Sequence, residues 1–250
     1  MKVWEKAKKV TDFTQLQPKE GAPMTEETAA YIGYDSRNLY VAFRAKDSEP
    51  QKIRSHLAPR DQASGDDWVA IILDTFGDQR RAYEFFSNPL GIQMDAFSSA
   101  GNEDQSPDFV WHAAGKVSSD GYAVEFRIPL KSLRFPDTEE QRWRIYFARN
   151  IERKNEKGLW PLFHANSGSL FSQMAELKGV RGITPGGRLE LIPEFTASRT
   201  TPFESQENAF HLGSWNMRAG LNARHALSPN WAMDATYNPD FSQVEADQPQ

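Results

Sequence analysis

The sequence contains no cysteine in its 250 residues, and it has no long apolar run. Without cysteine, disulfide bridges, thiolate metal ligands and cysteine nucleophiles are excluded. A membrane-spanning helix needs about 18 consecutive apolar residues, and the sequence has no such stretch. The basic start of the chain is not followed by the apolar stretch of about 7–15 residues that an export signal contains. If the protein is exported, we therefore expect its signal upstream of Met1.

An excess of positive charge is also missing, because 29 Lys and Arg residues stand against 34 Asp and Glu residues, for a net charge of −5. The basic residues are scattered along the chain. Domains that bind nucleic acid usually carry a basic patch or stripe. We therefore expect no nucleic-acid partner.

The residue patterns of common catalytic sites are missing as well. The five histidines have no metal-ligand spacing, and there is neither a Gly-x-Ser-x-Gly motif nor a phosphate-binding loop. Glycoside hydrolysis needs two carboxyl groups about 5–10 Å apart. Asp66 and Asp67 cannot form that pair, because adjacent residues of a strand point to opposite faces. The sequence thus predicts a non-catalytic protein, with a glycan-active hydrolase as a remote alternative.

Aromatic and turn-forming residues are abundant, with 12% Phe, Trp and Tyr, 15 Pro and 16 Gly. This composition favours many short strands separated by turns. A hairpin is predicted over residues 28–46, with its turn at 35–38, because Asp and Asn suit a turn. Further strands are predicted at residues 68–73, 82–87, 91–96, 116–117, 122–128, 142–150 and 175–180. The fold class is therefore all-β, and residues 1–182 are predicted to form a β-sandwich.

Three segments near the end of the chain alternate between apolar and polar residues. They begin at residues 188, 214 and 230, and their apolar sides include Leu191, Phe195 and Met217. A period of two indicates strands with one apolar and one polar face. Strands of about 9–11 residues with this pattern are typical of a membrane-spanning β-barrel. An amphipathic sheet packed on a soluble core has the same pattern, so alternation alone leaves both open.

A stretch rich in Gly and Pro, residues 181–187, precedes the alternating segments. Such stretches commonly mark domain boundaries. The predicted domains are therefore residues 1–182, the sandwich, and residues 183–250, the alternating strands.

Four sequence strings are characteristic of one family. They are GDDWVAIILDTF at residues 65–76, AYEFFSNPLG at 82–91, EFRIPLKSLRF at 125–135 and NPDFSQVEAD at 238–247. The chain thereby resembles large Gram-negative outer-membrane proteins whose amino-terminal domain is similar to carbohydrate-binding module family 9 and precedes a barrel domain of unknown function. The resemblance implies a jelly-roll or immunoglobulin-like sandwich followed by the opening strands of an outer-membrane β-barrel. It also implies a location at the outer membrane or in the periplasm.

Two departures from the family pattern concern the ends of the chain. Family members usually open with an Asp-Gly-containing strand ahead of the Trp-Glu-Lys-Ala string, which stands here at residues 4–7. The alternating region ends after about three strands, too few to close a barrel. We therefore expect this chain to be a fragment of a longer protein.

Sugar binding is the activity that the resemblance implies. It requires flat aromatic faces for the apolar sides of a sugar ring and a few fixed polar groups for its hydroxyls. The candidate carbohydrate-binding residues are Trp68, Trp111 and Trp160, with Arg149, Asn150 and Gln173 as hydrogen-bonding groups. Trp68 opens the apolar run 69–73, so a place in the core is its alternative. The two tryptophans that enclose the sugar in family members have no clear match at the corresponding positions, Ser64 or its neighbour and residues 168–171.

Structural calcium is a second implication of the resemblance. Hard cations prefer clustered oxygen ligands such as carboxylates and backbone carbonyls. Asp47 follows a predicted strand at the position where the resemblance places a calcium ligand, and Glu49 lies two residues further on. Two solvated loop acids are the alternative.

The expected function is therefore non-catalytic binding of a glycan or oligosaccharide at the Gram-negative cell envelope, linked to carbohydrate catabolism or uptake. The outer membrane is the expected second partner, through the barrel strands. The alternative is a structural outer-membrane barrel protein whose sandwich plugs or scaffolds the barrel without binding sugar.

Overall fold

The structure is a computed structural model, and it describes Trp4 and residues 7–99, 102–185, 189–199, 203–204, 209–210, 213–228 and 231–238. The chain divides into two compact units, residues 1–186 and 187–250. The boundary predicted from sequence, after residue 182, lies just before this division.

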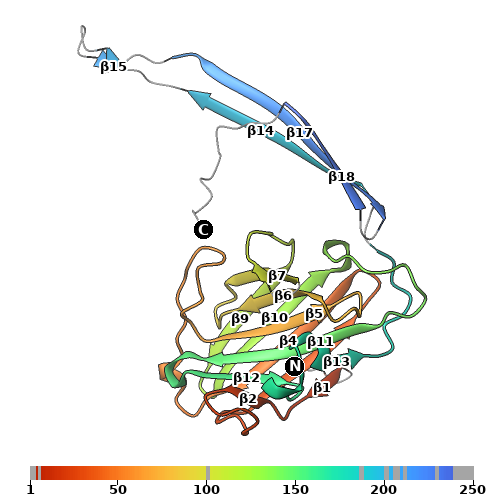
Figure 1. Cartoon of the computed structure of the whole chain (residues 1–250). Coiled ribbons are helices and arrows are strands. Elements are labelled where there is room, and N and C mark those ends of the chain that lie inside the picture. Colours follow the sequence, from red (N-terminus) through yellow and green to blue (C-terminus); the bar gives the residue numbers. More distant parts are fainter. Residues whose placement is uncertain are drawn as a thin grey trace. The chain divides into compact units, whose positions relative to one another are not determined.

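The first unit consists of two antiparallel sheets (Figure 1). The five-stranded sheet has the order β1 (Lys8–Val10), β3 (Thr28–Tyr34), β4 (Asn38–Lys46), β10 (Gly121–Pro129) and β9 (His112–Ser118). The eight-stranded sheet has the order β2 (Thr14–Gln17), β12 (Glu156–Trp160), β11 (Trp143–Ile151), β5 (Trp68–Asp74), β6 (Arg81–Ser87), β7 (Gln93–Ser99) and β8 (Asn102–Asp104), with β13 (Ala175–Leu177) also paired to β11. The described helical turns are all of the 3-10 type: η2 (Pro50–Lys52), η3 (Leu130–Ser132), η4 (Glu152–Lys154), η5 (Ala165–Ser167) and η6 (Phe171–Gln173).

This arrangement confirms the predicted all-β sandwich. The predicted hairpin is formed by β3 and β4, and the Asp35 carboxylate accepts hydrogen bonds from the backbone N–H groups of Arg37 and Asn38 in its turn, both at 2.7 Å. The expected strand at 116–117 is longer and begins at His112, and the one at 175–180 ends at Leu177. Strands β2 and β12 were not predicted, since both are short and mix polar with apolar residues.

Side chains of the two sheets fill the space between them. Phe43 of β4 contacts Phe126 in its own sheet and Phe147 in the opposite sheet, with ring centroids 5.6 Å and 5.7 Å apart. Leu39, Val41 and the other inward residues of β4 are also buried. Alternation along the strands thus builds the inter-sheet core.

The eight-stranded sheet is buried on its outer face as well. Val69, Ile71 and Leu73 of β5 belong to the inter-sheet core, whereas Ala70 and Ile72 belong to a second apolar cluster on the outside. The segment 161–174 supplies Phe163, Leu170, Phe171 and Met174 to that outer cluster. Burial on both faces explains why residues 69–73 form a continuous apolar run.

The second unit contains a three-stranded antiparallel sheet in the order β14 (Leu189–Arg199), β17 (Trp215–Ser228) and β18 (Trp231–Tyr237), and a pair formed by β15 (Phe203–Glu204) and β16 (Ala209–Phe210). The register pairs Phe195 with Ala219 and Leu221 with Tyr237, so the apolar sets of the three strands share one face. That face is exposed, with Phe195 70% and Tyr237 77% accessible. The predicted alternating strands are thereby confirmed. Within the described residues, no helix is long and apolar enough to span a bilayer.

Candidate functional site

Strand register divides the sequence-predicted site residues between the two faces of the eight-stranded sheet. In the pairing of β11 with β5, Asn150 lies opposite Trp68, and Arg149 lies opposite Val69. Val69 faces the inter-sheet core. Because successive residues point to opposite faces, Arg149 faces inward, and Asn150 and Trp68 face outward. The predicted residues therefore do not form one site.

Arg149 has a structural role instead of the predicted ligand contact. Its side chain is fully buried between the sheets. The guanidinium donates hydrogen bonds to the Thr28 hydroxyl at 2.9 Å and to the backbone carbonyls of Glu27 and Lys46 at 3.1 Å and 2.7 Å. It also lies 5.6 Å from the Tyr122 ring centre. Arg149 therefore ties the two sheets together and cannot reach a sugar.

Trp111 and Trp160 both point toward the inter-sheet core, and the burial of Trp111 corrects its prediction as a stacking residue. Trp111 is 3% exposed, and its ring lies edge-on to Phe85 and Phe126, with centroids 5.2 Å and 5.0 Å away. Trp160 is half-buried and packs against the inter-sheet cluster, with its ring 6.0 Å from that of Phe147. The Trp111 ring thus has no free face for a sugar, and the Trp160 ring belongs to the core side of β12.

Four partly exposed aromatic rings gather on the outside of the eight-stranded sheet. They are Trp68, Phe86, Phe163 and Phe171, which pack against one outer cluster and are called the outer aromatic face below. Trp68 and Phe86 meet edge to face, with centroids 5.2 Å apart at 88°.

Strands and the covering segment both contribute to the outer aromatic face. Trp68 begins β5 and Phe86 belongs to β6, whereas Phe163 and Phe171 belong to the segment 161–174. Of the predicted tryptophans, Trp68 alone belongs to this face.

Gln173 and Asn150 hold the surroundings of the outer aromatic face in place. Gln173 closes a loop, because its amide accepts from the N–H of His164 at 3.0 Å and donates to the carbonyl of the same residue at 2.9 Å. This loop separates Phe163 from Phe171. Asn150 is buried and donates to the Asp66 carbonyl at 3.2 Å and to Glu152 Oε2 at 3.0 Å. Both side chains thus position the loops beside the face.

A buried acid lies on the same side of the sheet. Glu84 precedes Phe86 by two positions on β6, so both point outward. Burial raises the pKa of Glu84 to about 7, and the Ser98 hydroxyl donates a hydrogen bond to its carboxylate. The outer side thus combines apolar rings with a carboxyl group that is uncharged over part of the physiological pH range.

Three phenylalanines of the outer aromatic face are not among the candidates predicted from the sequence, although the sequence contains hints of their position. Phe86 alternates with the buried Phe85 in β6, and Phe163 and Phe171 flank the polar stretch 164–169. A search limited to tryptophan overlooks these phenylalanines, although a sugar ring can stack on either ring type.

The oxygen atoms around Asp47 do not fit a calcium site. Both carboxylate oxygens of Asp47 accept hydrogen bonds from the Arg153 guanidinium, at 2.6 Å and 2.8 Å. Burial alone would lower the pKa of Arg153, but the hydrogen bonds and charge of Asp47 raise it overall. Glu26 accepts from Lys154 at 2.5 Å, and the partly exposed Glu49 pairs with Lys52. The positive charge that calcium would supply is provided here by side chains.

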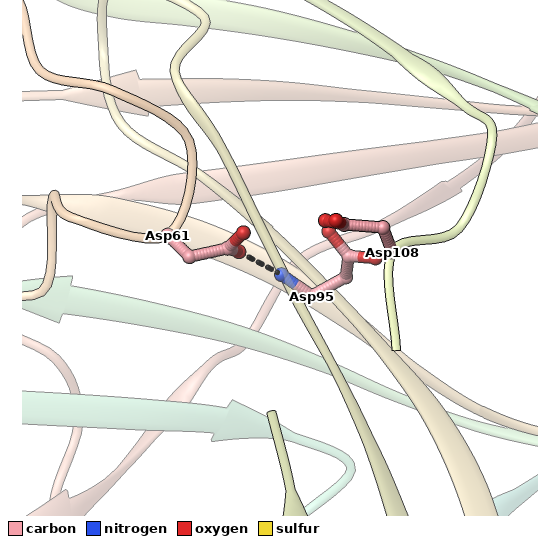
Figure 2. Close-up of side chains that lie close together, drawn as sticks. All are labelled: Asp61, Asp95 and Asp108. Atoms are coloured by element: carbon pink, nitrogen blue, oxygen red, sulfur yellow. Dashed lines mark hydrogen bonds between the residues drawn. The ribbon is translucent and has the colours of Figure 1, made fainter. Parts of the chain in front are cut away.

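A second group of acids is shown in Figure 2. Carboxylate oxygens of Asp61, Asp95 and Asp108 lie within 4.8 Å of one another. The Arg60 guanidinium pairs with Asp95, with Asp108 at 3.0 Å and with Asp61 at 3.6 Å. Asp61 also accepts from the backbone N–H of Asp95 at 3.0 Å, the dashed line in Figure 2. Burial, followed by the charge of Asp95, raises the pKa of Asp61. The cluster therefore holds the loops that carry Asp61 and Asp108 against β7, and Arg60 neutralises part of its negative charge.

The class of the first unit, a domain like carbohydrate-binding modules, follows from a comparison with known families. A family model described as carbohydrate family 9 binding domain-like matches residues 1–159, and the chain belongs to that family. The family consists of non-catalytic binding modules, so the prediction that the domain is not an enzyme is confirmed.

Known proteins are similar to part of the chain. Endo-1,4-beta-xylanase C of Paenibacillus barcinonensis is 26% identical over 142 residues, which make up 57% of this chain and 12% of the xylanase. The chain thus spans only a small part of that relative. A structure of a Bacteroides uniformis protein to which carbohydrate binding is ascribed has a TM-score of 0.55 at 11% identity, covering 69% of this chain and 86% of the other. That likeness concerns the fold alone.

A family 9 carbohydrate-binding module of Caldicellulosiruptor kristjanssonii is also similar. Its complexes with glucose and with cellotriose give TM-scores of 0.47 and 0.46 at 15% identity. They cover 74% of this chain and 88% and 86% of the module, respectively.

Proposed function

We propose that the first unit binds a neutral glycan on its outer aromatic face. The observation that carries this proposal is the gathering of Trp68, Phe86, Phe163 and Phe171, all partly exposed, on one side of one sheet. Sugar rings stack their apolar C–H faces on such aromatic rings. Membership of a family of carbohydrate-binding modules supports the same chemistry.

The position of these rings suits a ligand that lies along the sheet. Trp68 and Phe86 are on rigid strands, and the loop that carries Phe163 and Phe171 is closed by Gln173. Aromatic groups that are fixed before binding lose little conformational entropy when a ligand arrives. We therefore expect the face to keep its shape on binding.

Removal of an aromatic ring tests this proposal. The full chain and its Trp68→Ala and Phe171→Ala variants are passed through affinity gels of neutral gluco- and xylo-polysaccharides. We expect each variant to bind about tenfold more weakly, the equivalent of about 1.4 kcal/mol. Tyr34→Ala is the matched control, because Tyr34 is an exposed aromatic residue of the five-stranded sheet and belongs to neither the outer aromatic face nor its surroundings.

Two results would contradict the proposal. One is the absence of retention of the wild-type chain on any neutral polysaccharide. The other is retention that is unchanged in both variants. The first result would favour the alternative, a structural protein whose sandwich binds no sugar.

We propose further that the second unit faces a membrane, as in an outer-membrane protein of the cell envelope. Support comes from the exposed apolar face of its sheet, which carries Leu191, Phe195, Met217 and Tyr237. In lipid, an apolar face is stable without a protein partner. An outer-membrane barrel and a link to carbohydrate uptake or catabolism belong to this proposal.

Vesicle flotation of the full chain tests the membrane proposal. Phe195→Asp introduces a charge on the apolar face and should abolish co-flotation, because an acidic side chain is costly in hydrocarbon. Ser198→Asp introduces the same charge on the opposite face, where Ser198 pairs with Asn216, and should leave co-flotation unchanged. Equal effects of the two substitutions would refute a membrane-facing role for the apolar side.

A further inference from the structure

A hollow lies on the outside of the five-stranded sheet, on a different sheet from the outer aromatic face. Its volume is about 330 Å³, and its lining includes Trp4, Tyr40, His112, Glu125 and Arg127. It is called the Arg127 groove below. The register places Arg127 between Tyr40 of β4 and His112 of β9 in one row across three strands. Three neighbouring strands thus present an aromatic ring and two basic groups side by side.

Small residues and an aromatic wall give the groove its shape. In the next row, Glu125 pairs with Ala114, whose short side chain leaves space beside the longer ones. The indole N–H of Trp4 donates to Glu125 Oε1 at 2.7 Å, and its ring lies 6.3 Å from that of Tyr31. Trp4 therefore forms a fixed wall and engages the one acid that lines the groove.

Tyr40 is also held in a fixed orientation. Its hydroxyl donates to Asp35 Oδ2 at 2.9 Å and accepts from the Asn38 amide at 3.2 Å. Its ring is half-buried at the groove. An aromatic ring whose polar end is satisfied elsewhere offers its face to an incoming ligand at little entropic cost.

The basic groups of the groove are unpaired. Among the described residues, neither Arg127 nor His112 has a hydrogen-bond or ion-pair partner, and both side chains are exposed. Lys116, two positions from Ala114 on the same face of β9, is likewise without an acid partner in the described part of the chain. Two other cations of this sheet are neutralised, since Arg44 pairs with Asp120 and Lys46 with Glu27. This face thus has free positive charge on a chain with a net charge of −5.

We propose that the Arg127 groove is a second glycan site, specific for an acidic sugar that carries a carboxylate. The planar guanidinium of Arg127 matches a carboxylate in a bidentate manner. Tyr40 and Trp4 provide the ring faces against which the pyranose lies. Lys116 extends the positive field toward neighbouring acidic units of the glycan, and the His112 ring offers a further hydrogen-bonding group beside Arg127. The site is on a different sheet from the outer aromatic face and does not depend on it.

Calorimetry of the full chain with trimers of galacturonate, glucuronate or mannuronate tests this site. We expect at least one trimer to bind, and we expect its methyl ester, which keeps the ring but loses the charge, to bind about tenfold or more weakly. Arg127→Gln should weaken binding of the acidic trimer by about ten- to a hundredfold. Arg127→Lys should retain part of the affinity, because lysine keeps the positive charge but cannot bind a carboxylate in the bidentate manner of a guanidinium.

Matched controls separate this site from a general charge effect. Arg181→Gln removes an exposed positive charge that pairs with Glu140 and should leave binding unchanged. Trp68→Ala should also leave it unchanged, which distinguishes failure of the groove from failure of the outer aromatic face. A thermal melt of each variant confirms that it is folded. The proposal is overturned if no uronate trimer binds, if acid and ester bind equally, or if Arg127→Gln and Arg181→Gln behave alike.

Discussion

At the scale of single residues, the first unit neutralises its buried carboxylates with its own cations. Asp47 and Glu26 are buried and are paired with Arg153 and Lys154. Removing one partner of a buried pair leaves an uncompensated charge, which costs far more than losing a surface pair. We therefore expect Arg153 to be important for folding and calcium to be dispensable at Asp47.

Thermal melts of Arg153→Gln test this expectation. The substitution should lower the free energy of unfolding by about 3 kcal/mol, because Asp47 loses its counter-charge. Lys52→Gln is the control, because it breaks the exposed pair with Glu49 and should cost less than about 1 kcal/mol. Adding calcium should leave the wild-type melting temperature unchanged. A rise that Asp47→Ala abolishes would restore the calcium site.

The raised pKa of Glu84 predicts that the stability of the folded protein depends on pH. Burial raises this pKa in the folded protein from the ordinary value of 4.5 to about 7. A raised pKa means that the folded state resists ionisation of the Glu84 carboxyl group. The stability that the folded protein has with Glu84 protonated is therefore fully present below about pH 4.5 and is lost as the pH rises to about 7. Glu84→Gln should therefore be more stable than wild type at pH 8, by on the order of 3 kcal/mol, and nearly equal at pH 4. Denaturant titrations at the two pH values measure this difference, and a difference that does not change with pH would rule out burial of the charge.

At the scale of elements, the sequence pattern is informative where one face of a strand is exposed. The alternation in β14, β17 and β18 predicts which residues share a face, and the register bears this out. Strand β11 is different, because eight of its nine residues are buried. Its pattern does not tell which residues point inward, so the sequence alone does not separate Arg149 from Asn150, although the two face opposite sides of the sheet.

The same difficulty affected the tryptophans. Trp111 immediately precedes β9, and its burial depends on Phe85 and Phe126 from other strands. Such contacts depend on the pairing of distant strands, which the local sequence does not reveal. Trp68 is partly buried against the outer cluster, so it has both a core contact and an exposed part. Sequence patterns thus predicted the sandwich, but they do not reveal which of its side chains, such as Trp111 and Arg149, are buried between the sheets.

At the scale of the whole molecule, the chain combines a carbohydrate-binding module with a sheet that has one apolar face. The two proposed sugar sites lie on different sheets of the first unit, so a neutral and an acidic glycan would not compete for the same residues. The membrane proposal for the second unit is independent of both. Refutation of one of the three proposals would therefore leave the other two unaffected.

The most direct test of the central claim is a crystal structure of the full chain with a bound neutral oligosaccharide. We predict that a sugar ring lies within about 4.5 Å of Trp68 or Phe171, parallel to the aromatic ring and outside the eight-stranded sheet. A neutral sugar found elsewhere, with the outer aromatic face empty, would contradict the claim.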